Sequence, residues 1–103
     1  MNDYPPDHDI EINPFILEEM MVYLGKARYK HPVHARSMLE SVALVCEESG
    51  EALREVLTIR QEGLTMEGVS KALDEMYQTV AVGIRSIGYL EGVISEIEMV
   101  GDK

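Results

Sequence analysis

Apolar residues recur every three or four positions along most of this chain, which is the period of α-helices that bury one face. No segment alternates apolar and polar residues as a half-buried strand would. A first helix is predicted over about residues 14–30, because Asn13 is a good N-cap and Pro14 suits the first helical position. His31-Pro32 ends it, since a residue before proline resists helical geometry.

The capping-box pattern Ser37-Met38-Leu39-Glu40 predicts that a second helix begins near Ser37, or a few residues earlier near His34, and runs to about Gln61 before Gly63. Thr65 is the predicted cap of a third helix that runs through at least Arg85. Residues 89–100 form either a short fourth helix or a continuation. The expected fold is all-α, a bundle of about four helices over residues 13–103, preceded by an N-terminal arm of residues 1–12.

Two broad apolar arcs are the predicted core. The arc of the second helix contains Met38, Val42, Val45, Cys46, Ala52, Leu53, Val56 and Leu57, and that of the third contains Val69, Leu73, Met76, Tyr77, Val80, Ile84 and Ile87. The opposite face of the third helix carries Lys71, Glu75, Gln78, Val82 and Arg85. We expect another helix or a second subunit to cover this face and to bury Val82, so a homodimer or homotetramer assembled through the second and third helices is predicted.

Composition narrows the class of protein. The 103 residues suffice for one domain, and 19 acidic against 9 basic side chains give a net charge of −10, which disfavours general capture of nucleic acid. No apolar run approaches the roughly 20 residues of a membrane span, and the N-terminus does not resemble a signal peptide. The single cysteine, Cys46, suits a reducing compartment. A cytoplasmic protein without membrane or nucleic-acid partners is expected.

The densest charge lies in Glu47-Glu48-Ser49-Gly50-Glu51, within a segment that otherwise has the pattern of a buried helix. Glu47 and Glu48 both neighbour Glu51 on a helix, and each like-charged pair costs roughly 0.2–0.5 kcal/mol. A hard divalent cation would offset that cost, because Mg²⁺ prefers oxygen ligands and is commonly shared between carboxylates and phosphates. The alternative is an ordinary solvated helix face.

The pattern Glu48-Ser49-Gly50-Glu51, followed by Glu75-Met76-Tyr77-Gln78 on the next helix, resembles the MazG-like all-α nucleoside triphosphate pyrophosphohydrolases over roughly residues 15–90. The resemblance implies that Glu48, Glu51 and Glu75 bind Mg²⁺, with Mn²⁺ as a possible substitute. It also implies a nucleotide substrate, cleaved to the monophosphate and pyrophosphate, and sites closed across subunits. A ferritin-like di-iron bundle is set aside, since its Glu-x-x-His motifs do not occur.

Gln78 departs from the family pattern, which has aspartate at that position. A neutral amide offers one carbonyl oxygen and no charge, so weaker metal binding at Gln78 is expected. Asp74 would substitute only if the helix were rotated. The alternative function is therefore a catalytically degenerate helical module that binds nucleotide or another protein.

For an active site, Glu47 or Glu51 is the predicted catalytic carboxylate that orients the attacking water or accepts its proton. The predicted phosphate-binding side chains are Lys71 and Arg85, which share the face of Glu75, and Lys30 and Arg36, which belong to the basic stretch from Lys26 to Arg36. That stretch is also explained as a basic helix end that complements the helix dipole.

Overall fold

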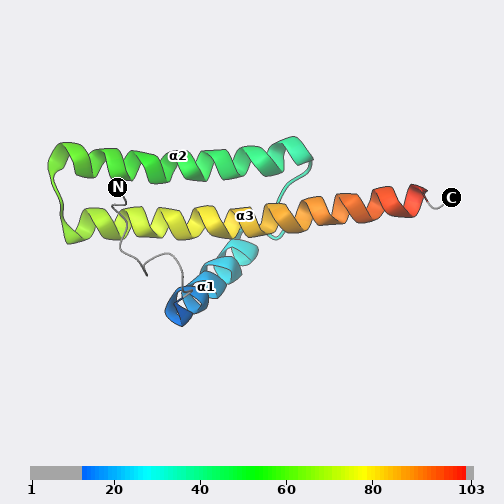
Figure 1. Cartoon of the computed structure of the whole chain (residues 1–103), viewed down its shortest axis with the longest axis horizontal. Helices are drawn as coiled ribbons and strands as arrows, with labels where there is room; N and C mark the ends of the chain where they lie inside the picture. The colour runs from blue at the N-terminus through cyan, green and yellow to red at the C-terminus, as the bar shows by residue number, and fades with distance from the viewer. Residues whose placement is uncertain (1–12, 102–103) are drawn as a thin grey trace, which may run out of the picture.

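A computed structural model describes residues 13–101, and these form three helices. Helix α1 spans Pro14–Lys30, α2 spans Met38–Glu62, and α3 spans Met66–Gly101. Figure 1 shows α2 and α3 side by side as a long hairpin, with α1 crossing α3 on the other side. The all-α class is confirmed, whereas the predicted N-terminal arm lies outside the described residues.

Local side chains define the helix ends as the sequence predicted. The Asn13 side chain accepts a hydrogen bond from the Phe15 amide at 2.9 Å, and Pro14 occupies the first helical position. The Ser37 hydroxyl accepts from the Glu40 amide at 3.1 Å and begins α2. Each bond satisfies an amide that has no partner within its helix.

The turn between α2 and α3 needs only three residues. Gly63 ends α2 with φ of +102°, a backbone conformation that residues other than glycine rarely adopt. The Thr65 hydroxyl then accepts from the Gly68 amide at 2.9 Å, as expected of a cap. A Cβ atom at Gly68 would lie 3.1 Å from the Ile59 side chain, so this glycine allows α3 to approach α2 closely.

The hairpin is antiparallel, and α1 packs only on α3 within residues 13–101. Ser86 donates its hydroxyl to the Ser41 carbonyl at 3.0 Å, which joins α3 to α2. Arg85 donates to the carbonyls of Ala27 at 3.1 Å and His31 at 2.6 Å. These two bonds attach α3 to the last turn of α1, where carbonyls lack helical partners.

The predicted fourth helix is not a separate element in the described part of the chain. Helix α3 is a single element of 36 residues that continues through Gly88 and Gly92. In Figure 1 its last turns extend beyond the N-terminal end of α2. Glycine costs only about 1 kcal/mol within a helix, so neither residue is sufficient to end one.

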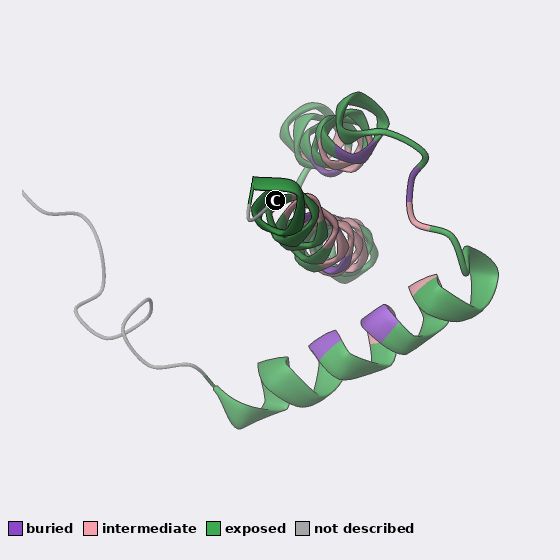
Figure 2. Cartoon of the chain, turned by 90° about the vertical axis from the view of Figure 1, so that its right-hand side faces the viewer, coloured by how far each residue is buried: buried purple, intermediate pink, exposed green. Residues whose placement is uncertain are grey.

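The prediction of the core was wrong, because it placed the core on the wrong side of α2 and α3. Most of the two apolar arcs are exposed, and Cys46, which was placed in the core, is also exposed. The buried apolar side chains of the described residues are instead Met20, Leu24, Ala35, Ala52, Ala72 and Ala81. Figure 2 shows that the buried positions of α1 lie on its side toward α3. Helix α1 thus covers the polar face of α3 and, of the apolar arc, reaches Tyr77 through Tyr23.

Another helix or a second subunit was the expected cover for the face of Glu75, Gln78 and Val82, and α1 supplies the first of these. The face is covered within one chain, so no second subunit is required to enclose it, and Val82 is half-buried. None of the described helices is long and apolar enough to cross a membrane.

Candidate metal and phosphate site

Three predicted metal ligands converge in the structure. Glu48 and Glu51 lie one helical turn apart on α2, and Glu75 approaches them from α3. One carboxylate oxygen from each lies within 4.8 Å of the other two. The antiparallel register produces this meeting, because it places residues in the middle of α2 opposite residues in the middle of α3.

The cluster is more buried than a solvated helix face would be. One carboxylate oxygen of Glu48 and one of Glu75 have no contact with solvent and no hydrogen-bond partner among the described residues. Burial, and secondarily the charge of Glu51, raises the pKa of both Glu48 and Glu75. Buried oxygens without donors are unfavourable unless a proton or a cation satisfies them. The donor set therefore fits a hard divalent cation such as Mg²⁺.

Glu47 does not join this cluster. It is exposed, and it projects about 100° around α2 from Glu48. Of the two predicted catalytic carboxylates, only Glu51 lies against the other acidic groups. The structure thus brings together three of the four glutamates that the sequence singled out.

Gln78 and Asp74 form a pair on α3. The Gln78 amide nitrogen donates to the Asp74 carboxylate at 2.8 Å, so the Gln78 carbonyl oxygen is directed elsewhere. The other Asp74 oxygen accepts a hydrogen bond from the Tyr23 hydroxyl of α1. Asp74 is therefore engaged with two donors and stays outside the glutamate cluster.

Tyr23 was not identified from the sequence. Its ring stacks on Tyr77 with centroids 5.0 Å apart, and the Lys26 ammonium lies 5.5 Å from its centroid. The hydrogen bond to Asp74 is the main reason that its pKa rises to about 12, and burial adds to this effect. No local pattern signals the residue, because Asp74 and Tyr77 lie more than 50 positions away along the chain.

Two adjoining cavities of about 380 and 370 Å³ are lined by residues of α1, α2 and α3. Both are lined by Ala27, His31, Glu48 and Val82, so they form one trough with Glu48 at the middle. Basic side chains gather along this trough, although the chain is strongly acidic overall; they are Lys26, Lys30, Arg36 and Arg85. A trough with carboxylates at one side and basic side chains along its walls is complementary in charge to a metal-bound polyphosphate.

Three of the predicted phosphate ligands reach the trough. Lys30 lines one of its cavities, and Arg36 and Arg85 line the other. Arg85 already donates to two carbonyls of the α1 end, and burial, followed by repulsion from Arg28, lowers its pKa. Its guanidinium therefore positions α1 as well as contributing charge.

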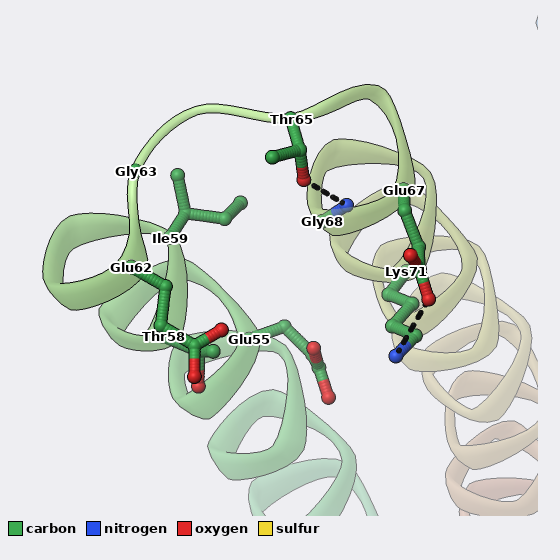
Figure 3. Close-up of a pocket in the computed structure, with 9 residues that line it drawn as sticks. All are labelled: Glu55, Thr58, Ile59, Glu62, Gly63, Thr65, Glu67, Gly68 and Lys71. Carbon is green, nitrogen blue, oxygen red and sulfur yellow. Dashed lines mark hydrogen bonds and ion pairs between the residues drawn. The ribbon is translucent and has the colours of Figure 1, made fainter.

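Lys71 does not lie in the trough. It pairs with Glu67 at 3.4 Å beside a hollow of about 150 Å³ at the α2–α3 turn, which Figure 3 shows together with Glu55 and Glu62. Lys71 also lines an open hollow next to Glu75. It lies closer to the α2–α3 turn than the basic trough does.

His34, which follows α1, lies among serines at the far end of the trough. Its Nε2 is 2.9 Å from the Ser41 hydroxyl and 3.0 Å from that of Ser86. Since Ser86 donates its proton to the Ser41 carbonyl, it is left to accept from His34, which favours the tautomer protonated at Nε2. Burial, followed by the charge of Arg85, lowers the pKa of His34.

No family model, no curated protein and no solved structure matches this chain. The glutamate cluster and the basic trough beside it are therefore the features that bear on function.

Proposed function

We propose that this protein is a Mg²⁺-dependent nucleotide pyrophosphohydrolase, which cleaves a nucleoside triphosphate or related nucleotide to the monophosphate and pyrophosphate. The observation that carries the proposal is the meeting of Glu48, Glu51 and Glu75 within 4.8 Å, with two carboxylate oxygens buried and unpartnered. Such oxygens are suited to a divalent cation, and the basic trough beside them is suited to phosphate groups.

Each polar residue has a distinct role in this proposal. Glu48, Glu51 and Glu75 would hold Mg²⁺ or Mn²⁺, and the Gln78 carbonyl is a neutral candidate for a further ligand. The bound cation would supply charge neutralisation at the phosphate oxygens and would activate a water molecule. Glu51 is the better candidate to orient that water, since Glu47 projects away from the cluster.

The basic side chains would bind the phosphates. Lys30 and Arg36 line the trough and have no ion pair among the described residues, so both are available to a polyphosphate. Arg85 would fix the wall on which they lie, through its bonds to Ala27 and His31. Glu48, shared by both cavities, connects the metal ligands with this phosphate-binding surface.

A degenerate module that binds nucleotide without cleaving it is the second candidate. Gln78 favours it, because a neutral amide tied to Asp74 contributes no charge to the metal ligands. Gln78→Asp separates the two functions. If the amide alone limits catalysis, the substitution should increase metal affinity and pyrophosphate release together. A variant that binds Mg²⁺ more tightly and remains inactive would favour the degenerate module.

Pyrophosphate release from a panel of nucleotides in millimolar Mg²⁺ tests the proposal directly. Glu48→Gln should abolish release without unfolding α2, because glutamine preserves shape and helix propensity while removing the charge. Glu62→Gln is the matched control, since Glu62 is an exposed glutamate of the same helix away from the cluster. Equal rates for both variants, or no nucleotide-dependent release by the wild type, would count against the enzymatic function.

A further inference from the structure

The connection between α1 and α2 forms part of the wall of the basic trough. It covers residues 31–37, between the end of α1 and the start of α2. Four of its side chains line the trough, and they are His31, Val33, His34 and Arg36. Arg36 has no ion pair within residues 13–101, so its guanidinium is available to a phosphate group. What holds this connection in place therefore affects the phosphate-binding surface.

Backbone hydrogen bonds do not hold the connection. The His31 amide donates to the Ala27 carbonyl, and the Ser41 amide donates to the Ser37 carbonyl. Between these two bonds, residues 32–36 make no backbone–backbone hydrogen bond to any other described residue. Segments that lack such bonds open easily and move more than helices do. Side chains must therefore fix the position of residues 32–36.

His34 is the polar anchor of the connection. Its Nε2 lies 2.9 Å from the Ser41 hydroxyl of α2 and 3.0 Å from the Ser86 hydroxyl of α3. Ser41 is 0% exposed and Ser86 is 5% exposed, and buried hydroxyls require hydrogen-bond partners. Apart from His34, Ala35 is the one residue of the connection that is not exposed. The imidazole thus joins the connection to both helices of the hairpin.

Two consecutive residues of α3 hold the connection at two points. Arg85 donates to the His31 carbonyl at 2.6 Å, where α1 ends. Ser86 contacts the ring of His34, three positions further along the connection. Arg36 follows only two positions after this anchored ring, and α2 begins directly after the next residue. The chain around Arg36 is therefore short and fixed on both sides.

We propose that His34 is a positioning residue, which holds Arg36 at the trough where a phosphate group binds. This role rests on the proposed function, in which Arg36 is one of the phosphate ligands. The physical reason is preorganisation. An arginine on a mobile segment loses conformational freedom when it binds an anion, whereas an arginine on an anchored segment has already lost part of it during folding. His34 thus increases phosphate affinity through Arg36.

Calorimetric titration of the full chain with inorganic pyrophosphate, in millimolar Mg²⁺, tests this role. His34→Ala should weaken binding about 3- to 10-fold, because the segment must then be ordered on binding. His34→Gln should recover most of the affinity, since the glutamine amide nitrogen reaches about as far as Nε2 and donates to the same hydroxyls. Equal affinities of wild type and His34→Ala would overturn the proposal.

A double-mutant cycle shows whether His34 acts through Arg36. Arg36→Met should weaken pyrophosphate binding at least as much as His34→Ala does. Adding His34→Ala to Arg36→Met should then cause no further loss, because the positioned side chain is already absent. Losses that multiply in the double variant would overturn the proposal, since His34 would then act on the ligand directly or on the whole fold.

Trypsin cleavage of the ligand-free protein measures the anchoring without any phosphate. His34→Ala should speed cleavage after Arg36 severalfold, whereas cleavage after Arg60, an exposed arginine of α2, should keep the wild-type rate. His34→Gln should behave as the wild type. Ser86→Ala removes one of the two hydroxyls and should show the same local change if His34→Ala does not fold. Equal acceleration at Arg36 and Arg60 would overturn the proposal.

This role and the enzymatic function fail in different experiments. A wild type that binds pyrophosphate and shows the expected dependence on His34, yet releases none from nucleotides, would contradict the enzyme and support the role of His34. A wild type that releases pyrophosphate from nucleotides at the same rate and the same KM as His34→Ala would overturn the role of His34 alone. Absence of pyrophosphate binding by the wild type would also overturn it.

Discussion

The two sides of the α2–α3 hairpin use opposite kinds of residues. The side toward α1 contains carboxylates, serines, an arginine and small alanines, and it is covered within the chain. The other side contains most of the large aliphatic residues, and it is exposed. Hydrophobic burial ordinarily favours the reverse. Specific polar contacts therefore place α1, while the larger apolar surface stays exposed in the chain.

The side toward α1 still has a small apolar contact, and removing it should have the largest effect. Leu24 of α1 is only 5% exposed, so Leu24→Ala should lower the free energy of unfolding by about 2–5 kcal/mol. Urea denaturation followed by circular dichroism measures this loss. Leu17→Ala, at an exposed position of the same helix, should change stability by less than about 0.5 kcal/mol. Equal losses would mean that α1 does not dock through Leu24.

A smaller effect is expected from the polar contacts on that side. Arg85→Met removes the donors to the Ala27 and His31 carbonyls and should cost about 1.5–3 kcal/mol. Arg54, an exposed arginine of α2, provides the control, and Arg54→Met should be nearly neutral. Hydrogen exchange should show faster opening of the last turn of α1 in Arg85→Met alone. Uniformly faster exchange throughout the chain would contradict a local clamp.

The next effect in size is the response of the glutamate cluster to Mg²⁺. At ten times the dissociation constant, Mg²⁺ should stabilise the wild type by about 1.4 kcal/mol, because it binds only where the three carboxylates converge. Glu48→Gln should raise the stability of the metal-free protein and abolish the response to Mg²⁺. Thermal melts with and without Mg²⁺ measure both effects. The same response in wild type and variant would remove Glu48 from the ligands.

The smallest effect is the dependence of this cluster on pH in metal-free protein. The folded-state pKa of Glu48 is raised above its ordinary 4.5, so the folded protein holds this proton more tightly than the unfolded chain. The free energy of unfolding should therefore fall as pH rises through 4.5 and the folded pKa. Glu48→Gln lacks this ionisation, so its advantage should be small below pH 4.5 and grow above it. An advantage that is constant with pH would contradict the assigned burial.

The sequence predicted the helices better than their mutual orientation. Asn13, Ser37, Gly63 and Thr65 act on neighbouring backbone groups, so local patterns were sufficient to place the helix ends. The meeting of Glu48, Glu51 and Glu75 was also accessible, because a short turn between two helices fixes their register. Whether α1 packs on the polar or the apolar side of α3 could not be predicted, since periodicity identifies an apolar face without identifying what covers it.

The contacts of α1 with α3 could not be predicted from the sequence. They join residues far apart along the chain, such as Tyr23 with Asp74 and Arg85 with Ala27. Neither pair has a spacing that marks it in advance. Lys71 illustrates the same limit, because it shares a helix with Glu75 but lies away from the basic trough.

The three-residue turn from Gly63 to Thr65 has a consequence for the order of folding. It joins α2 and α3 through a very short loop, so the hairpin can form with little loss of chain entropy. Docking of α1 instead closes a loop of more than 50 residues, from Ala27 to Arg85. Contacts between residues distant in sequence form more slowly than local ones. We expect the hairpin to assemble first and α1 to complete the trough last, so any phosphate-binding surface would appear only at the final step of folding.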